Sequence, residues 1–148
     1  MTIPWDALRD AARQARNRSH SPYSGFAVGA AALGSSGAIF SGTNIEVSSY
    51  GLTLCAERLA VFKAIEAGER SVTAIALIAD TPTPCPPCGA CRQVIHDFGP
   101  NAEILMEDAS GSTTTTTIGE LLPNAFTPEH FLHVAAIHAR QLAQAEDD

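Results

Sequence analysis

Three cysteines and one glutamate lie in two short stretches of the chain. Cys55 stands two residues before Glu57, and Cys88 and Cys91 follow in a Cys-x-x-Cys pattern. Thiolates are common ligands of zinc, and three of them leave the fourth tetrahedral position open for water. A carboxylate two residues from a ligand is close enough to move a proton of that water. The spacing therefore predicts one catalytic Zn²⁺ held by Cys55, Cys88 and Cys91, with Glu57 carrying protons.

Two arginines directly follow these residues. Three thiolates around Zn²⁺ leave a net negative charge, which weakens the ability of the ion to acidify bound water. Arg58 follows Glu57 and Arg92 follows Cys91, so either guanidinium could donate hydrogen bonds to the ligand sulfurs. We expect both arginines to compensate the charge around the metal.

Cys85 allows a different interpretation of the same stretch. The segment Cys85-Pro86-Pro87-Cys88 is a second Cys-x-x-Cys, so all four cysteines could form a closed structural zinc site in a non-catalytic interaction module. Such a site would leave Glu57 without a purpose other than a favourable interaction with a helix dipole. We therefore expect Cys85 to stay outside the metal site.

The metal-binding residues must be positioned by two helices. Small and apolar residues over 54–67 predict a largely buried helix that begins at Cys55 and ends at Gly68. A shorter helix is expected over 88–98, which places Cys88 and Cys91 one turn apart at its start. Helix N-termini carry partial positive charge that lowers thiol pKa values, so both helices favour the thiolate form.

Helical and extended segments alternate along the rest of the chain, which indicates an α/β domain. A first helix is expected over 4–18, a hairpin over 26–33 and 38–44, strands over 72–79 and 102–107, and an edge strand in the threonine run 113–117. No linker or internal repeat interrupts this pattern, so residues 1–148 form one domain, with a helical extension at about 128–148.

The hydrophobic content and net charge of the chain exclude some classes of function. The chain has 148 residues, of which 45% are hydrophobic, and a net charge of -7 with Lys63 as its only lysine. These values argue against disorder and against a surface that binds nucleic acid, because no basic stripe is available. Residues 1–6 lack the features of a signal peptide, and no run is long enough to span a membrane. We expect a cytoplasmic protein whose cysteines serve as thiolate ligands.

The chain resembles the zinc-dependent cytidine deaminases at five places, in the order that the family has them. Two are the segments around Cys55 and Cys88 described above. The others are residues 23–31 as the first strand, residues 44–46 as the sugar-binding segment, and residues 121–126 as the C-terminal motif. The resemblance covers roughly residues 22–128. It implies a three-layer α/β/α sandwich with a mixed β-sheet.

The resemblance also implies the activity and the substrate-binding residues. Glu57 would move protons during hydrolytic deamination of cytidine and 2′-deoxycytidine to uridine and 2′-deoxyuridine plus ammonia. The residues that would bind the nucleoside are Phe26, Asn44, Glu46, Tyr50, Ala56 and Phe126, with Gln93 supporting the site together with the two arginines. Asn44 and Glu46 would bind the ribose 3′-hydroxyl. The three-cysteine branch of the family is homotetrameric, so Phe126 would reach the pocket of a neighbouring subunit and Tyr50 would lie at a subunit contact.

Departures from the family pattern concern the subunit contact and the end of the chain. Val47 and Ser48 stand where many relatives carry Asn-Ala, and the chain continues well beyond the C-terminal motif. A modified cytosine nucleoside such as blasticidin S is an alternative substrate, since its deaminases share the metal motifs. Those enzymes tend to lack the counterparts of Arg58, Asn44 and Glu46, and this favours ordinary cytidine.

Overall fold

A mixed five-stranded sheet forms the centre of the computed structural model, which describes residues 2–132 and 134–137. The strand order is β2-β1-β3-β4-β5. β3 and β4 are parallel, and the other neighbouring pairs are antiparallel. The strands are β1 (Val28–Gly34), β2 (Ile39–Thr43), β3 (Val72–Ala79), β4 (Glu103–Glu107) and β5 (Thr113–Thr117). The mixed sheet and the edge position of the threonine strand are confirmed.

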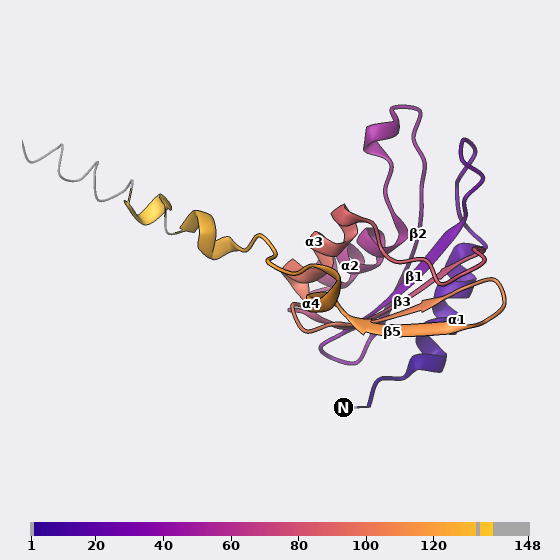
Figure 1. Cartoon of the computed structure of the whole chain (residues 1–148), viewed down its shortest axis with the longest axis horizontal. Coiled ribbons are helices and arrows are strands. Elements are labelled where there is room, and N and C mark those ends of the chain that lie inside the picture. Colours follow the sequence, from indigo (N-terminus) through magenta and orange to yellow (C-terminus); the bar gives the residue numbers. More distant parts are fainter. Residues whose placement is uncertain (1, 133, 138–148) are drawn as a thin grey trace, which may run out of the picture.

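Helices cover both faces of the sheet (Figure 1). The helix α1 (Trp5–Arg16) packs Leu8 and Ala12 on one face, and α2 (Ala56–Glu66), α3 (Gly89–Phe98) and the short α4 (Ile118–Leu121) pack on the other. A short 3-10 turn, η1 (Tyr50–Leu52), lies between β2 and α2. The expected three-layer α/β/α architecture is therefore confirmed. Within the described residues, no helix has both the length and the apolar character that a membrane span needs.

β1 contributes to both layers of the core. Ala30 and Ala32 lie in the cluster under α2, whereas Ala31 and Leu33 lie in the cluster under α1. Small side chains on this strand let helices approach the sheet closely from both sides. The run of apolar residues without alternation thus reflects burial on two faces, as expected from the sequence.

Gly42 brings the first turn of α2 against β2. A Cβ atom at this position would lie 2.4 Å from the carbonyl oxygen of Ala56 and 2.5 Å from the amide nitrogen of Ala60. No side chain larger than hydrogen fits there without moving the helix. The start of α2, which carries the metal motif, is consequently fixed on the sheet by a backbone contact.

Two sequence expectations about the helices need adjustment, and a third agrees with the structure where it is described. The first helix ends at Arg16 rather than Arg18. The helix predicted over 54–67 is α2, and it is not buried all round, because the side of α2 that faces away from the sheet leaves Phe62 42% exposed. Residues 128–132 and 134–137 are helical as predicted, while the rest of the predicted terminal helix lies outside the described residues.

Candidate metal centre and active site

The three predicted ligand thiols converge at the N-termini of α2 and α3. Cys55 is the N-cap residue of α2, Cys88 is the N-cap residue of α3, and Cys91 lies in the first turn of α3. Their sulfur atoms all lie within 4.8 Å of one another. The distance between the Sγ atoms is 3.9 Å for Cys55 and Cys88 and 3.4 Å for Cys88 and Cys91. Two chain segments more than 30 residues apart thus form one cluster.

This cluster fits a zinc ion. Tetrahedral Zn–S bonds of about 2.3 Å place ligand sulfurs about 3.8 Å apart, close to the two distances found here. Hydrogen bonding from Cys91 and the nearby Arg58 guanidinium lower the pKa of Cys55 to about 5. The thiolate of Cys55 in turn raises the pKa of Cys91. Proteins ionise several neighbouring thiols together when a cation balances their charge, and the donor set is the one that Zn²⁺ prefers.

Of the two arginines, one contacts a ligand sulfur. Arg58 donates from Nη2 to the Sγ of Cys55 at 3.3 Å and to the carbonyl oxygen of Thr53 at 3.1 Å. Arg92 instead donates to the carbonyl oxygens of Pro87 and Leu121, both at 2.8 Å. The expectation that Arg92 donates to a ligand sulfur is corrected, because its guanidinium is held between two backbone segments. Arg92 thereby fastens the residue before Cys88 to the end of α4.

Glu57 lies in the first turn of α2 with only 5% of its surface exposed. Burial raises the pKa of its carboxyl group to about 7, and the charge of Cys55 acts in the same direction. A carboxyl group with a pKa near neutrality can both accept and release a proton at physiological pH. The structure therefore places a group suited to proton transfer beside the thiol cluster.

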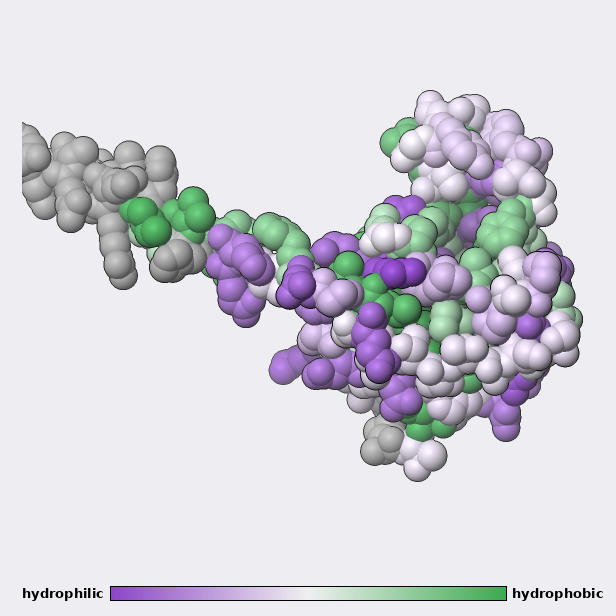
Figure 2. All heavy atoms as spheres, viewed as in Figure 1, coloured by the Kyte–Doolittle hydropathy of each residue, from purple (hydrophilic) through white to green (hydrophobic). Residues whose placement is uncertain are grey.

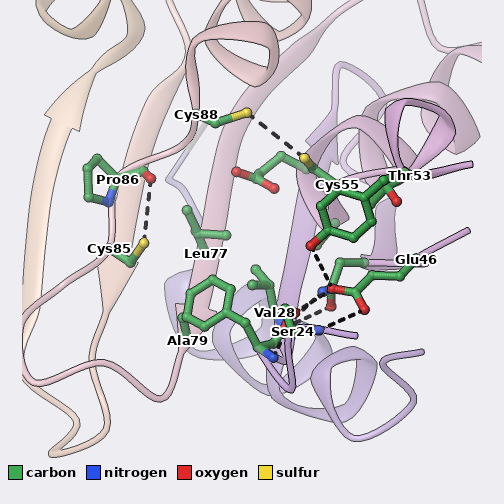
Figure 3. A pocket seen from close by; sticks show the side chains of 15 residues that line it. Ser24, Val28, Glu46, Thr53, Cys55, Leu77, Ala79, Cys85, Pro86 and Cys88 are labelled. Carbon is green, nitrogen blue, oxygen red and sulfur yellow. Dashed lines mark hydrogen bonds between the residues drawn. The ribbon is translucent and has the colours of Figure 1, made fainter. Parts of the chain in front are cut away.

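A pocket of about 280 Å³ opens next to the cluster and is lined by Cys55, Glu57 and Cys88 on the metal side. The residues that complete it are Ser24, Phe26, Val28, Asn44, Glu46, Tyr50, Thr53, Ala56, Leu77, Ala79, Cys85 and Pro86. Figure 3 shows Cys55 and Cys88 at one end of the pocket and the Ser24 and Glu46 pair at another side. Its size suits a small molecule rather than a polymer.

Asn44 is buried and joins the end of β2 to the start of β1. Its Oδ1 accepts hydrogen bonds from the backbone N–H of Val28 at 2.9 Å and from the Ser19 hydroxyl at 2.6 Å. Its Nδ2 donates to the carbonyl oxygen of Phe26 at 2.7 Å. The side chain therefore fixes the backbone around Phe26, whose ring lines the pocket.

Glu46 holds the loop that precedes β1. Its carboxylate accepts hydrogen bonds from the backbone N–H groups of Tyr23 and Ser24, at 2.8 and 3.2 Å, and from the Ser24 hydroxyl. The Tyr50 hydroxyl lies 3.5 Å from its Oε1. These hydrogen bonds, chiefly that of the Ser24 hydroxyl, lower the pKa of Glu46, so this carboxylate stays ionised and accepts hydrogen bonds in the pocket.

Phe126 and Gln93 do not line the pocket of their own chain. Phe126 is 57% exposed and lies in the segment that leaves the domain after α4. Gln93 donates from Nε2 to the carbonyl oxygen of Phe126 at 2.8 Å and to Asp97 at 2.9 Å. Gln93 thus anchors the segment that carries Phe126 rather than contacting the thiol cluster.

Sequence reasoning missed part of the pocket wall. Cys85 lines the pocket but is outside the thiol cluster of the described residues, so the four-cysteine alternative does not form. Leu77 and Ala79 also line it, from the end of β3, and Ser24 contributes its hydroxyl. Alternation along β3 could have indicated that residues 77 and 79 share a face, but no signal in the sequence showed which face borders the pocket.

Comparisons with known proteins agree with this geometry. Residues 5–107 match the family model for the cytidine and deoxycytidylate deaminase zinc-binding region. A cytidine deaminase of Halalkalibacterium halodurans is 51% identical over 78% of this chain and 89% of that protein. A cytidine deaminase of Sporosarcina psychrophila is 46% identical over 83% of this chain and 91% of that protein.

Solved structures of cytidine deaminases also match this chain. The crystal structure of cytidine deaminase from Burkholderia pseudomallei matches with a TM-score of 0.80 and 46% identity, over 85% of this chain and 100% of that chain. The enzyme from Mycobacterium tuberculosis matches with a TM-score of 0.73 and 39% identity, over 84% of this chain and 98% of that chain. With its three converging thiols, its buried glutamate and these matches, the chain belongs to the cytidine and deoxycytidylate deaminase family of zinc-binding enzymes.

Proposed function

We propose that this chain hydrolytically deaminates cytidine and 2′-deoxycytidine, releasing ammonia and the corresponding uridine nucleoside in pyrimidine salvage. The observation that carries the proposal is the buried Glu57, whose pKa is raised to about 7, between the thiol cluster and a nucleoside-sized pocket. The names of relatives up to 51% identical support the same substrate.

One bound zinc ion per chain, held by Cys55, Cys88 and Cys91, would supply Lewis-acid activation of water. Glu57 then accepts a proton from the attacking water and delivers it to N3 of the cytosine ring while C4 is attacked. The same group, again ionised, next takes the proton of the new C4 hydroxyl and passes it to the amino group, so that the C4–N bond breaks, the C4 carbonyl forms, ammonia leaves and the carboxylate is regenerated. Arg58 supports this chemistry through its hydrogen bond to Cys55.

The opposite part of the pocket would bind the sugar. Asn44 and Glu46 line the pocket and are buried acceptors with defined orientations, so they suit hydroxyl groups of a ribose. Phe26 would pack beside the nucleoside, and the backbone of Ala56 would contact the base. No lysine and no arginine lines the pocket among the described residues, which predicts poor use of the 5′-monophosphate.

A substrate panel tests the proposal. Loss of the cytosine chromophore is followed with cytidine, 2′-deoxycytidine, cytidine 5′-monophosphate, free cytosine and blasticidin S. We expect turnover of the two unmodified nucleosides, with the monophosphate and free cytosine much poorer. Turnover of blasticidin S alone would instead establish the alternative, a deaminase of modified nucleosides, and no turnover of any member would refute the deaminase activity.

We further propose a homotetramer with shared active sites. Phe126 is exposed and does not line the pocket of its own chain, which suits insertion into the pocket of a neighbour. Phe62 on the outer face of α2 is a second exposed aromatic side chain that an interface would cover. Light scattering of the purified protein tests the assembly, and a monomer at micromolar concentration would contradict it.

We also place the protein in the cytoplasm. All four cysteines are free thiols, and such thiols persist in a reducing compartment. Fractionation of the native host cells, followed by immunodetection, tests the location. Recovery of the protein outside the cytoplasmic fraction would contradict it.

A further inference from the structure

Ser24 is a pocket residue to which the proposed mechanism gives no part. It lies in the loop between α1 and β1, two residues before Phe26, and it lines the pocket together with Phe26 and Glu46. This loop and the segment between β2 and α2 project side by side from the domain (Figure 1). Figure 2 shows mainly residues of intermediate hydropathy on the outer surface of these projections. Hydrogen bonds to one carboxylate, that of Glu46, join the two segments.

The hydroxyl group of Ser24 connects two residues that the proposed function assigns to substrate binding. It donates a hydrogen bond to Oε1 of Glu46 and accepts one from the backbone N–H of Phe26 at 3.0 Å. The backbone N–H of Ser24 donates to the other carboxylate oxygen, Oε2, at 3.2 Å. A hydroxyl group has one proton to donate and two lone pairs that accept, so both contacts exist at once. Ser24 thus fixes the Glu46 carboxylate relative to the backbone that carries the Phe26 ring.

The two oxygens of the Glu46 carboxylate are held by different donors. Oε2 accepts from the backbone N–H groups of Tyr23 and Ser24. For Oε1, the other donor among the described residues is the Tyr50 hydroxyl at 3.5 Å, which is at the long limit for such a bond. The bond from the Ser24 hydroxyl is also the largest cause of the lowered pKa of Glu46. Removing this hydroxyl would therefore leave Oε1 without a short hydrogen bond from the protein.

The same arrangement occurs a second time, away from the pocket. In the turn between β1 and β2, the Ser36 hydroxyl donates to Oε1 of Glu69, and the Ser36 backbone N–H donates to Oε2 at 3.0 Å. Oγ of Ser36 accepts from the backbone N–H of Ala38, two residues later, at 3.3 Å. Neither Ser36 nor Glu69 lines the pocket. The chain thus contains one serine–glutamate arrangement in two settings, and the copy at Ser36 shows what it does for the structure alone.

We propose that Ser24 is a positioning residue for the sugar of the substrate and acts through Glu46. The inference rests on the proposed function, in which Glu46 accepts a hydrogen bond from the ribose 3′-hydroxyl. A carboxylate that is already oriented by Ser24 loses little conformational freedom when the nucleoside binds. Figure 3 shows Ser24 and Glu46 on a different side of the pocket from Cys55 and Cys88, so the contribution of Ser24 is to binding rather than to proton transfer.

Binding of a product nucleoside tests this role without requiring turnover. Isothermal titration calorimetry of the full-length, zinc-loaded protein measures the dissociation constants of uridine and 3′-deoxyuridine. Ser24→Ala should raise the constant for uridine about tenfold, because Glu46 loses its orientation. The constant for 3′-deoxyuridine should rise less than about threefold, since this ligand lacks the hydroxyl that Glu46 binds. Equal losses with both ligands would overturn the proposal, because general damage to the loop affects them alike.

Ser36→Ala is the matched control. It removes the same hydroxyl from the same arrangement outside the pocket, and both dissociation constants should stay within about twofold of those of the parent protein. Thermal unfolding compares the structural cost of the two substitutions, and metal analysis checks that both variants keep their zinc. Equal weakening of uridine binding by Ser24→Ala and Ser36→Ala would overturn the proposal.

A conservative variant and steady-state kinetics complete the test. Ser24→Thr keeps the hydroxyl and adds a methyl group to an exposed residue whose φ is not positive, so uridine binding should return to within about threefold of the parent value. With cytidine, Ser24→Ala should raise KM more than it lowers kcat, and the reverse would contradict a positioning role. A parent protein that binds uridine without deaminating cytidine would refute the proposed function alone. Deamination by the parent protein with no effect of Ser24→Ala would refute this inference alone.

Discussion

Two buried carboxylates at different places in the pocket have opposite electrostatic environments. Glu57 and Glu46 are both 5% exposed. Burial beside the ionised Cys55 raises the pKa of Glu57 to about 7. Glu46 accepts several hydrogen bonds from the loop before β1, which lower its pKa. With the same exposed fraction, Glu57 is suited to carry protons because desolvation dominates its pKa, whereas Glu46 is suited to accept hydrogen bonds because its hydrogen-bond donors dominate.

A third buried glutamate shows what a structural carboxylate looks like in this chain. Glu107, 3% exposed at the end of β4, pairs with Arg9 and Arg13 from α1. Its Oε1 lies 2.7 Å from Nη2 of Arg13, and it lies on the α1 side of the sheet rather than in the active-site pocket. The charge of Glu107 is balanced by its two arginine partners, so this carboxylate has no part in proton transfer. The pKa of Glu57 is instead determined by burial and by the neighbouring thiol cluster.

The largest expected effect comes from removing the proton carrier. Glu57→Gln should lower kcat by about 10³- to 10⁴-fold, because the amide cannot take a proton from water. Zinc content should remain one per chain, since the three thiols are unchanged. Steady-state kinetics together with metal analysis measure both values. Full activity in the variant would remove Glu57 from the chemistry.

A smaller effect is expected at the acceptor carboxylate. Glu46→Gln should lower kcat/KM about 10- to 100-fold, mainly through KM, because the proposed ribose contact loses its charged acceptor and the Tyr23 and Ser24 backbone loses its anchor. Kinetics with cytidine, and zinc content as a control, provide the measurement. If kcat fell while KM stayed constant, the two carboxylates would not have the separate roles described above.

The structural carboxylate should affect stability rather than catalysis. Glu107→Ala should reduce the free energy of unfolding by about 1–3 kcal/mol, since it leaves Arg9 and Arg13 partly buried without their partner. Urea denaturation measures this loss, and KM for cytidine should change less than about twofold. A large change in KM with unchanged stability would show that α1 and the pocket are coupled.

The smallest effect on activity is expected for Cys85, which lines the wall of the pocket. Cys85→Ala should leave zinc content unchanged and alter KM by less than about threefold, because this thiol lies outside the metal cluster and makes only a weak contact with Pro86. A structural four-cysteine site would lose its metal and unfold in the same variant. Metal analysis and thermal unfolding distinguish the two outcomes.

The sequence allowed much of the fold to be anticipated. The strand over 72–79 and the edge strand over 113–117 were predicted with the bounds that the structure has, because each is a continuous β-branched or apolar run between turn residues. α2 was correctly identified and was expected to be largely buried. Its outer face exposes Phe62, since a layer on one side of a sheet covers only one side of a helix.

The prediction that Arg92 donates to a ligand sulfur was wrong, and the direction of side chains on a helix explains why. Adjacency to Cys91 in the sequence suggested a sulfur contact, yet successive residues of a helix point in directions about 100° apart. Arg58 contacts Cys55 one turn away, whereas Arg92 reaches the carbonyl oxygens of Pro87 and Leu121. Folding of the whole chain brings the carbonyl oxygen of Leu121 next to Arg92, and no feature of the sequence near Arg92 indicates this partner.

Residue types and spacing were enough to identify the three thiols as a metal-binding set and to single out the glutamate two residues after Cys55. They also predicted the helices that begin at these motifs, because thiolate chemistry and helix starts depend on local sequence. Only the tertiary structure brought residue 55 within 3.9 Å of residue 88, set α2 against Gly42 and separated Cys85 from the cluster. It also gave Glu57 and Glu46 their different protonation behaviour. Convergence and pKa depend on which distant segments pack around a group, and that packing is a property of the folded chain.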